Sequence, residues 1–222
     1  AQHNLGNCYY YGRGVKKNYA QAVEWYLKAA EHGEADAQCS LGYCYENGHG
    51  VEQNYSKAIE LYAKAAEQGD AAAQYNLGIC YYDGRGVAPD YVKAVEWYAK
   101  SVEQGYSKAQ YNLGVCYDLG HGVAQDYAKA VELYSKAAEQ GNVQAQCNLG
   151  YCYTKGCGVE QSYDKAFEMY AKAAEQGDSL AQYNLGSCYY FGHGATQNYA
   201  KAAGWFLKSA EQGHAQAQCN LG

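Results

Sequence analysis

Ala37-Gln38-Cys39-Ser40-Leu41-Gly42 is one copy of a six-residue stretch that returns every 36 residues along this chain. The other copies begin at Ala1, Ala73, Ala109, Ala145, Ala181 and Ala217. The 222 residues therefore divide into six full periods, 1–36, 37–72, 73–108, 109–144, 145–180 and 181–216, and the opening of a seventh, 217–222. A fixed period of this length indicates a repeat array, in which one unit is too small to bury a core alone. We expect residues 1–222 to form a single array whose function lies on its surfaces.

The first half of each period predicts a helix. Ala37, Leu41 and Cys44 are spaced at i, i+4 and i+7, which places them on one apolar stripe of a helix over about 35–46. Asn47-Gly48-His49-Gly50 ends this helix, because glycine readily takes the left-handed conformation found at helix C-termini. We refer to this first helix of a period as helix A.

The second half of each period predicts another helix, which we call helix B. Asn54 is a good N-cap, and Tyr55, Ile59 and Tyr62 continue as an apolar stripe until Gly69. The capping column reads Asn18, Asn54, Asp90, Asp126, Ser162 and Asn198. The expected fold is therefore all-α, an α-solenoid of antiparallel helix hairpins with a 36-residue period and no strands.

Small and large residues occupy fixed columns, which explains how such hairpins stack. Gly6 and its equivalents lie inside helix A, where glycine costs ~1 kcal/mol relative to alanine. We therefore expect another group to approach the bare backbone there. The columns of Tyr9, Tyr19 and Tyr26 hold 17 of the 27 tyrosines. We interpret these columns as structural, with hydroxyl groups that reach backbone groups at the layer edges.

Six of the ten cysteines form a single column, with one copy in each period: Cys8, Cys44, Cys80, Cys116, Cys152 and Cys188. Stacked helices lie ~8–10 Å apart, whereas a disulfide needs its Cα atoms within ~7 Å. We therefore expect reduced core thiols, which favour a reducing compartment such as the cytoplasm.

Composition and motifs argue against several classes of function. A net charge of −6 argues against a nucleic-acid partner, since that binding rests on clustered Lys and Arg. No apolar run is long enough to span a membrane, so membrane insertion is not expected. The sequence has no phosphate loop, nucleophile elbow or His-Glu-x-x-His helix. We expect no enzymatic activity, no cofactor and no metal site.

The recurring motifs resemble the Sel1-like repeat family, a close relative of the tetratricopeptide repeat. They read Ala-x-Ala-Gln-Tyr-Asn-Leu-Gly, then Gly-x-Gly-Val, then Lys-Ala-Val-x-Trp-Tyr-x-Lys-Ala-Ala-Glu-Gln-Gly, and they cover the whole chain. The resemblance implies a right-handed superhelix with helix A lining a concave groove. It also implies non-catalytic adaptor work in signalling, protein quality control or bacterial–host contact. Some secreted members staple each repeat with a cysteine pair, but the nearest positions here hold residues such as Ala66 and Gln74.

One face of helix A, opposite the Ala-Leu-Cys stripe, varies between periods and is rich in tyrosine. Its tyrosines are Tyr10, Tyr43, Tyr75, Tyr82, Tyr111, Tyr151, Tyr183 and Tyr190. Tyrosine offers a large contact area at low entropy cost, so we predict that these residues bind a partner in the groove. The alternative is that some of them, above all in the Tyr75 column, pack between neighbouring A helices.

The residue between the paired loop glycines is basic or histidine in five of the six periods: Arg13, His49, Arg85, His121 and His193, with Cys157 in the fifth period. Such a row along one edge is able to bind an acidic peptide or a carboxylate. The alternative is an exposed loop position that tolerates any polar residue.

The outer face of helix B carries Lys57, Glu60, Lys64 and Glu67. Opposite charges at these spacings pair weakly along one helix, by ~0.2–0.5 kcal/mol each. We interpret this as a solvated convex face, although a charge run of this kind is also able to recruit a partner.

The function expected from these patterns is that of a protein-interaction scaffold that takes a peptide or protein segment in the groove lined by helix A. Two rivals remain: a structural spacer whose partners bind elsewhere, and an excised or consensus-like array without a partner of its own. A nucleic-acid reader of the helical-repeat type is a more distant rival, because the chain is acidic.

The ends of the chain carry a separate expectation. Repeat arrays usually finish with capping units that have a polar outer face. This sequence begins inside helix A and stops after Cys219 and Leu221, in the first turns of a further helix A. We expect these ends to fray first and to favour open, head-to-tail self-association.

Overall fold

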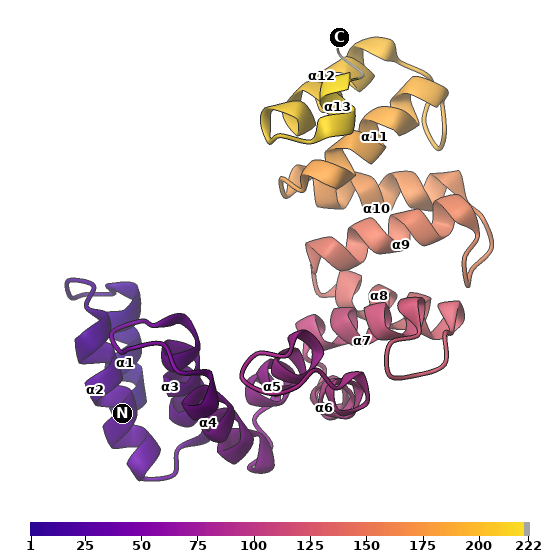
Figure 1. The fold of residues 1–222 in the computed structure, drawn as a ribbon. Helices are drawn as coiled ribbons and strands as arrows, with labels where there is room; N and C mark the ends of the chain where they lie inside the picture. The colour runs from indigo at the N-terminus through magenta and orange to yellow at the C-terminus, as the bar shows by residue number, and fades with distance from the viewer. Residues whose placement is uncertain (220–222) are drawn as a thin grey trace. The chain divides into compact units, whose positions relative to one another are not determined.

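The structure of the chain is a computed structural model that describes residues 1–219, and this part of the chain is all helical (Figure 1). Its α-helices are α1 (Gln2–Tyr11), α2 (Tyr19–Glu31), α3 (Ala35–Asn47), α4 (Tyr55–Glu67), α5 (Ala71–Asp83), α6 (Tyr91–Glu103), α7 (Ser107–Leu119), α8 (Tyr127–Glu139), α9 (Val143–Lys155), α10 (Tyr163–Glu175), α11 (Ser179–Phe191), α12 (Tyr199–Glu211) and α13 (Ala215–Cys219). Odd-numbered helices are the A helices and even-numbered ones the B helices. The predicted all-α solenoid of helix hairpins is thereby confirmed. None of the described helices is long and apolar enough to cross a membrane.

The chain forms two compact units, Ala1–Ala109 (unit 1) and Gln110–Gly222 (unit 2), and each is described by itself. Within unit 1, each helix from α1 to α6 packs on the next in the chain. Within unit 2, the same holds from α8 to α13. Cys219 is exposed at the end of α13, while Leu221 lies outside the described residues.

The predicted helix ends are confirmed by the caps. Asn54 Oδ1 accepts a hydrogen bond from the Lys57 amide at 3.0 Å, and the other five members of the capping column do the same for α2, α6, α8, α10 and α12. At the other end of the A helices, Gly48 closes α3 with φ 68°, a left-handed conformation that L side chains rarely adopt.

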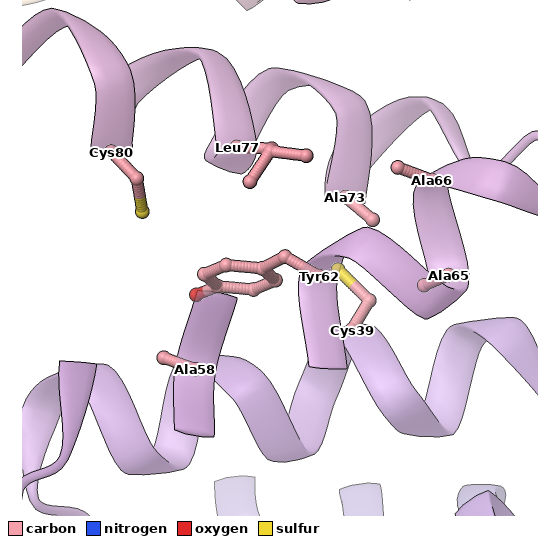
Figure 2. Close-up of a cluster of buried hydrophobic side chains, with 8 residues drawn as sticks. All are labelled: Cys39, Ala58, Tyr62, Ala65, Ala66, Ala73, Leu77 and Cys80. Carbon is pink, nitrogen blue, oxygen red and sulfur yellow. The ribbon is translucent and has the colours of Figure 1, made fainter. Parts of the chain in front are cut away.

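An aromatic ring of helix B forms the centre of each hairpin core, a tyrosine in the first five hairpins and Phe206 in the sixth. The ring of Tyr62 lies between Ala58 on its own helix and Leu77 on α5 (Figure 2). Gly42 of α3 faces the other side of this ring, and a Cβ added there would lie 2.8 Å from a ring carbon. The predicted close approach to the helix A glycine is therefore confirmed, and the group that approaches is the tyrosine.

We predicted that the hydroxyls of these core tyrosines would reach backbone groups. This prediction is wrong, because they donate to side chains of helix A. Tyr62 donates to Glu46 Oε2 at 2.6 Å, and Tyr26 donates to Asn7 Oδ1 at 2.7 Å. The Tyr19 column differs from the Tyr26 column in its burial. Its members at positions 55, 91, 127, 163 and 199 are exposed, because they lie at the first turn of helix B, at the edge of the hairpin.

Side-chain amides join the two helices of one hairpin and also link neighbouring hairpins. Gln68 at the end of α4 donates through Nε2 to Gln38 Oε1 of α3 at 2.8 Å. The same bond recurs between Gln104 and Gln74, Gln140 and Gln110, Gln176 and Gln146, and Gln212 and Gln182. Gln74 also donates to the Ala66 carbonyl at 3.2 Å, which links α5 back to α4. These amides satisfy buried polar groups that the apolar stripe leaves between helices.

Burial keeps most of the cysteine column protonated. Cys44, Cys80 and Cys116 are buried, and burial raises the pKa of each thiol to about 12. A thiol with such a pKa is a small apolar core group rather than a nucleophile at neutral pH.

The outer face of helix B is solvated, as predicted, although its pairing is different. Lys64 pairs with Glu60 at 2.6 Å, and both side chains are exposed. Lys57 does not pair along the helix: its ammonium lies 5.2 Å from the centroid of the Tyr45 ring. The same lysine–tyrosine contact recurs at Lys93, Lys129, Lys165 and Lys201. These lysines cover the half-buried Tyr9 column with their stems.

Candidate functional site

Unit 1 contains an open hollow with a volume of ≈ 470 Å³ on the side of its A helices. We call it the unit 1 hollow. It is lined by Asn7, Tyr10, Tyr11, Tyr26, Cys39, Ser40, Tyr43, Ala72, Tyr75, Asn76, Tyr106 and Lys108. Three predicted groove tyrosines, Tyr10, Tyr43 and Tyr75, come together here from α1, α3 and α5.

Tyr10 and Tyr43 form the end of the hollow where the A helices finish. Tyr43 is 43% exposed, so its ring is available to a partner. Tyr10 is half-buried, and its hydroxyl lies 2.8 Å from His49 Nδ1 in the next loop. Burial raises the pKa of the Tyr10 phenol, and neighbouring Tyr43 adds to the shift. Tyr10 is therefore held in place, while Tyr43 is the more accessible of the two rings.

Tyr75 forms the other end of the hollow and is partly a packing residue. Its ring lies 6.0 Å from that of Tyr98 and 5.3 Å from that of Tyr106, measured between centroids. Tyr106 was missed in the sequence, although a signal was present: it stands where the other periods have Glu34, Asp70, Asn142, Asp178 and His214. An aromatic residue in a capping column indicates a packing partner rather than a cap.

A second feature missed in the sequence is the polar floor of the hollow. Asn76 donates through Nδ2 to Cys39 Sγ at 3.7 Å, and Ser40 Oγ lies 3.0 Å from His3 Nε2. Both polar residues occupy the fourth position of the opening stretch, where the sequence has asparagine in six of the seven copies. That recurrence was the available signal for an amide-rich floor.

Tyr82, in the third repeat, is half-buried against Tyr91, with ring centroids 5.0 Å apart, and does not line the unit 1 hollow. Two other positions of the same helix A face are not available either. Cys39 and Glu46 are buried, and the Glu46 carboxylate accepts from Tyr62 and pairs with Arg85 Nη1 at 2.8 Å. This face is therefore only partly a surface.

In unit 2 the predicted tyrosines are more dispersed. Tyr183 and Tyr190 line a smaller hollow of ≈ 310 Å³ together with Ser187, Phe191 and Phe206. Tyr151 is 53% exposed. Tyr111 is half-buried, its ring lies 5.9 Å from that of Tyr134, and burial raises the pKa of its phenol.

The loop residues predicted to form a cationic edge mostly contact the preceding hairpin. His49 stacks on Tyr19 with ring centroids 4.6 Å apart and planes 7° apart, and His193 stacks on Tyr163 at 4.1 Å. Arg85 pairs with Glu46 of the preceding helix A. His121 is half-buried.

The loop residues contact the preceding hairpin because the glycine that follows them lies close to its backbone. At Gly50, for example, a Cβ would clash with the Tyr19 backbone. Arg13 contacts its own hairpin instead: it is exposed, and its guanidinium carbon lies 4.9 Å from the centroid of the Tyr11 ring.

Over residues 1–219, no group of three or more His, Cys, Asp or Glu side chains is arranged to hold a metal ion. What the site offers is a tyrosine-lined hollow with amide and hydroxyl groups on its floor, carried by stacked helix hairpins. The fold defines the chain as a helical-repeat protein built from stacked helix hairpins.

The chain belongs to the Sel1 repeat family. The family model matches residues 1–34, 35–70, 71–106, 107–142, 143–178 and 179–214, so each matched repeat ends at the residue that precedes the next helix A. No curated protein matches the chain.

Three solved structures show what the chain is similar to. One is c5321, described as a protective antigen present in uropathogenic Escherichia coli strains displaying an SLR fold: it is 44% identical, with a TM-score of 0.90 over 99% of this chain and 47% of that one. This chain thus spans about half the length of that protein. A Sel1 repeat protein from Oxalobacter formigenes is 37% identical, with a TM-score of 0.84 over 94% and 83%. The immunity protein PA5088 from Pseudomonas aeruginosa is 27% identical, with a TM-score of 0.55 over 83% and 67%.

Proposed function

We propose that this chain is a non-catalytic adaptor that binds an extended peptide or protein segment in the unit 1 hollow. Sel1 repeat proteins are generally protein-interaction scaffolds, and the family and its structural neighbours are non-catalytic. The observation that carries the proposal is the convergence of Tyr10, Tyr43 and Tyr75 from three successive A helices on one open hollow.

The hollow has the two kinds of groups that peptide recognition needs. Tyr43 and Tyr11 present exposed ring surface, and aromatic side chains are typical anchors at interfaces because they bury much area at low entropy cost. Asn76 and Ser40 on the floor are half-buried, so they keep capacity to hydrogen-bond a peptide backbone. A tyrosine wall beside an amide floor suits an extended segment better than a small molecule.

The experiment is a selection of displayed peptides on the purified chain, followed by affinity measurement with one selected peptide labelled with a fluorophore. We expect Tyr43→Ala to weaken binding by ~10-fold or more, which corresponds to ~1.4 kcal/mol. The matched control is Tyr55→Ala, which removes a comparably exposed ring that does not line the hollow. Equal loss in the two variants, or no loss in either, would support the structural spacer instead.

A further inference from the structure

The first interhelix loop, residues 12–18, differs in charge from every other loop of the chain. It reads Gly-Arg-Gly-Val-Lys-Lys-Asn and carries three positive charges, at Arg13, Lys16 and Lys17. The equivalent loops read Gly-His-Gly-Val-Glu-Gln-Asn, Gly-Arg-Gly-Val-Ala-Pro-Asp, Gly-His-Gly-Val-Ala-Gln-Asp, Gly-Cys-Gly-Val-Glu-Gln-Ser and Gly-His-Gly-Ala-Thr-Gln-Asn. With histidine neutral, none of those five has a net positive charge. We call residues 12–18 the basic loop.

The charges of the basic loop are exposed and have no acidic partner in the described residues. The positions of Lys16 and Lys17 are exposed in all six hairpins, including those with a hairpin on either side, so their exposure is a property of the loop. No ion pair involves Arg13, Lys16 or Lys17 within residues 1–219. Two of these cations lie over aromatic rings: Arg13 over Tyr11, and Lys17 with its Nζ 4.6 Å from the centroid of Tyr19.

Lys17 is not explained by the stability of the loop. In four other loops this position is glutamine, which donates to a helix A carbonyl: Gln53 to Glu46, Gln125 to Asp118, Gln161 to Thr154 and Gln197 to Tyr190, at 2.6–2.8 Å. Lys17 lies over Tyr19 instead and does not make this bond. The basic loop therefore lacks a hydrogen bond that recurs in four other loops, and it has an exposed cation at that position.

The basic loop borders the unit 1 hollow. Arg13 lies over Tyr11, which lines the hollow, and Tyr10, another lining residue, has its ring 4.9 Å from that of Tyr19, under Lys17. The cations thus stand directly beside the aromatic surface where the A helices end. On a chain of net charge −6, this is the place where a negative ligand is favoured.

We infer that the segment bound in the unit 1 hollow is acidic, and that the basic loop holds its carboxylates. This inference rests on the proposed function, and it adds the chemical class of the partner. A peptide fits better than an anionic membrane or a nucleic acid. Polybasic lipid-binding segments typically carry four to eight cations, and nucleic-acid affinity grows with the number of phosphates neutralised, whereas this loop has three cations on an acidic chain.

The test uses three fluorescein-labelled peptides that repeat Glu-Phe-Ser, Ser-Phe-Ser or Lys-Phe-Ser four times, so that all share the same phenylalanine anchors. We expect affinity for the intact chain to fall in the order Glu, Ser, Lys. We also expect the preference for the Glu peptide to shrink as salt rises, because exposed ion pairs are screened.

The decisive variant is Arg13→His/Lys16→Glu/Lys17→Gln, which gives the basic loop the sequence of the second loop, residues 48–54. That sequence already supports the same backbone, with Gly12 at φ 72° and Gly48 at φ 68°, and it restores the glutamine hydrogen bond. Thermal stability should therefore be unchanged or higher. We expect affinity for the Glu peptide to fall about 10-fold and affinity for the Ser peptide to remain the same.

The matched control is Lys136→Glu/Lys172→Glu, which lowers the net charge by the same four units at exposed positions of helix B. Equal affinities of the Glu and Ser peptides for the intact chain, or an equal loss in both variants, would overturn the inference. Phosphatidylserine vesicles that bind through the basic loop while the Glu peptide does not would also overturn it. If Tyr43→Ala abolishes binding of the Ser peptide, and the Glu peptide binds no more tightly than the Ser peptide, the proposed function is supported and the inference of an acidic partner is wrong. If no peptide binds, the proposed function and the inference are both wrong.

Discussion

The second and fifth hairpins, one in each unit, differ far less in sequence than in the contacts they make at the end of helix A. Residues 35–69 and 143–177 are identical at 25 of 35 positions. In the second hairpin, Tyr62 donates to the Glu46 carboxylate, which also binds Arg85. In the fifth, Tyr170 meets Thr154 Oγ1 at 3.2 Å, and this hydroxyl donates to the Gly150 carbonyl at 2.8 Å. Because the threonine proton is used in that bond, Tyr170 donates to Thr154, so the core tyrosine is the donor in both hairpins.

The second and fifth hairpins have the same buried core residues, and they differ in the polar residues next to the core tyrosine. The Glu46 carboxylate beside the core tyrosine is buried, and a buried carboxylate is costly without a cation. Arg85 of the next loop is that cation. Threonine requires none, and the next loop supplies His193, which stacks on Tyr163 instead. Glu46 is therefore coupled to Arg85 of the next repeat, and the effect of substituting one of them should depend on the other.

The largest expected effect concerns what the two hairpins share. A Cβ at Gly42 or Gly150 would lie 2.8 or 2.7 Å from the nearest ring carbon of the core tyrosine. Gly42→Ala and Gly150→Ala should each destabilise the protein by about 2–3 kcal/mol, because overpacking outweighs the better helix propensity. Gly204→Ala, with open space around it, should instead stabilise by ~0.5–1 kcal/mol. Urea unfolding measures all three; an unharmed Gly42→Ala would show that the ring yields freely.

The second prediction tests the coupling itself. Arg85→Ala leaves Glu46 buried beside Tyr62 without its cation, and we expect a loss of about 1–2 kcal/mol, moderated because the guanidinium is 45% exposed. In a Glu46→Thr background, which gives the second hairpin the residue of the fifth, Arg85→Ala should cost less than ~0.5 kcal/mol. Equal costs in both backgrounds would mean that Arg85 stabilises the protein through some other contact.

The third prediction concerns Asp70 and Asp178, the N-caps of α5 and α11. Burial raises the pKa of the Asp70 carboxyl, and neighbouring Asp36 adds to the shift, whereas the neutral Gln144 stands in the place of Asp36 for the second cap. A raised carboxyl pKa favours the folded state when the group is protonated, so this contribution is lost as pH rises through the folded pKa.

Asp70→Asn keeps a side chain that is able to cap, as Asn142 does for α9. Its thermal stability relative to the wild type should therefore increase as the pH rises from about 4, near the ordinary pKa of an aspartate, to pH 7. Asp178→Asn is the matched control, with a smaller change expected. A pH-independent difference for Asp70→Asn would show that the carboxyl pair carries no cost.

The smallest effect is chemical rather than energetic. Where the second loop has His49, the fifth has Cys157, which is half-buried. Burial raises the pKa of Cys147 and of Cys152 to about 12, so both remain thiols at pH 8 and react slowly. We expect iodoacetamide to label Cys157 in the folded protein, and all ten cysteines after denaturation without reductant. Cys157→His should remove that one label; labelling of Cys147 at the rate of Cys157 would contradict the burial argument.

The sequence by itself determined the fold, because its information is local and repeated. The caps at Asn54 and its equivalents, the terminating glycine at Gly48 and the apolar stripes each act within a few residues, and six copies of each agree. The sequence also predicted a tyrosine-rich face of helix A, and three of its members, Tyr10, Tyr43 and Tyr75, line one hollow.

Tertiary structure alone decided which members of that face are surface and which are core. Tyr43 and Glu46 lie on the same face of α3, yet one ring is exposed and the other side chain is buried under Arg85 from the following loop. The loop histidines stack on the preceding hairpin for the same reason. These contacts join residues about 30–40 positions apart, and no local pattern specifies them. Only the packing of one hairpin on the next brings their side chains together.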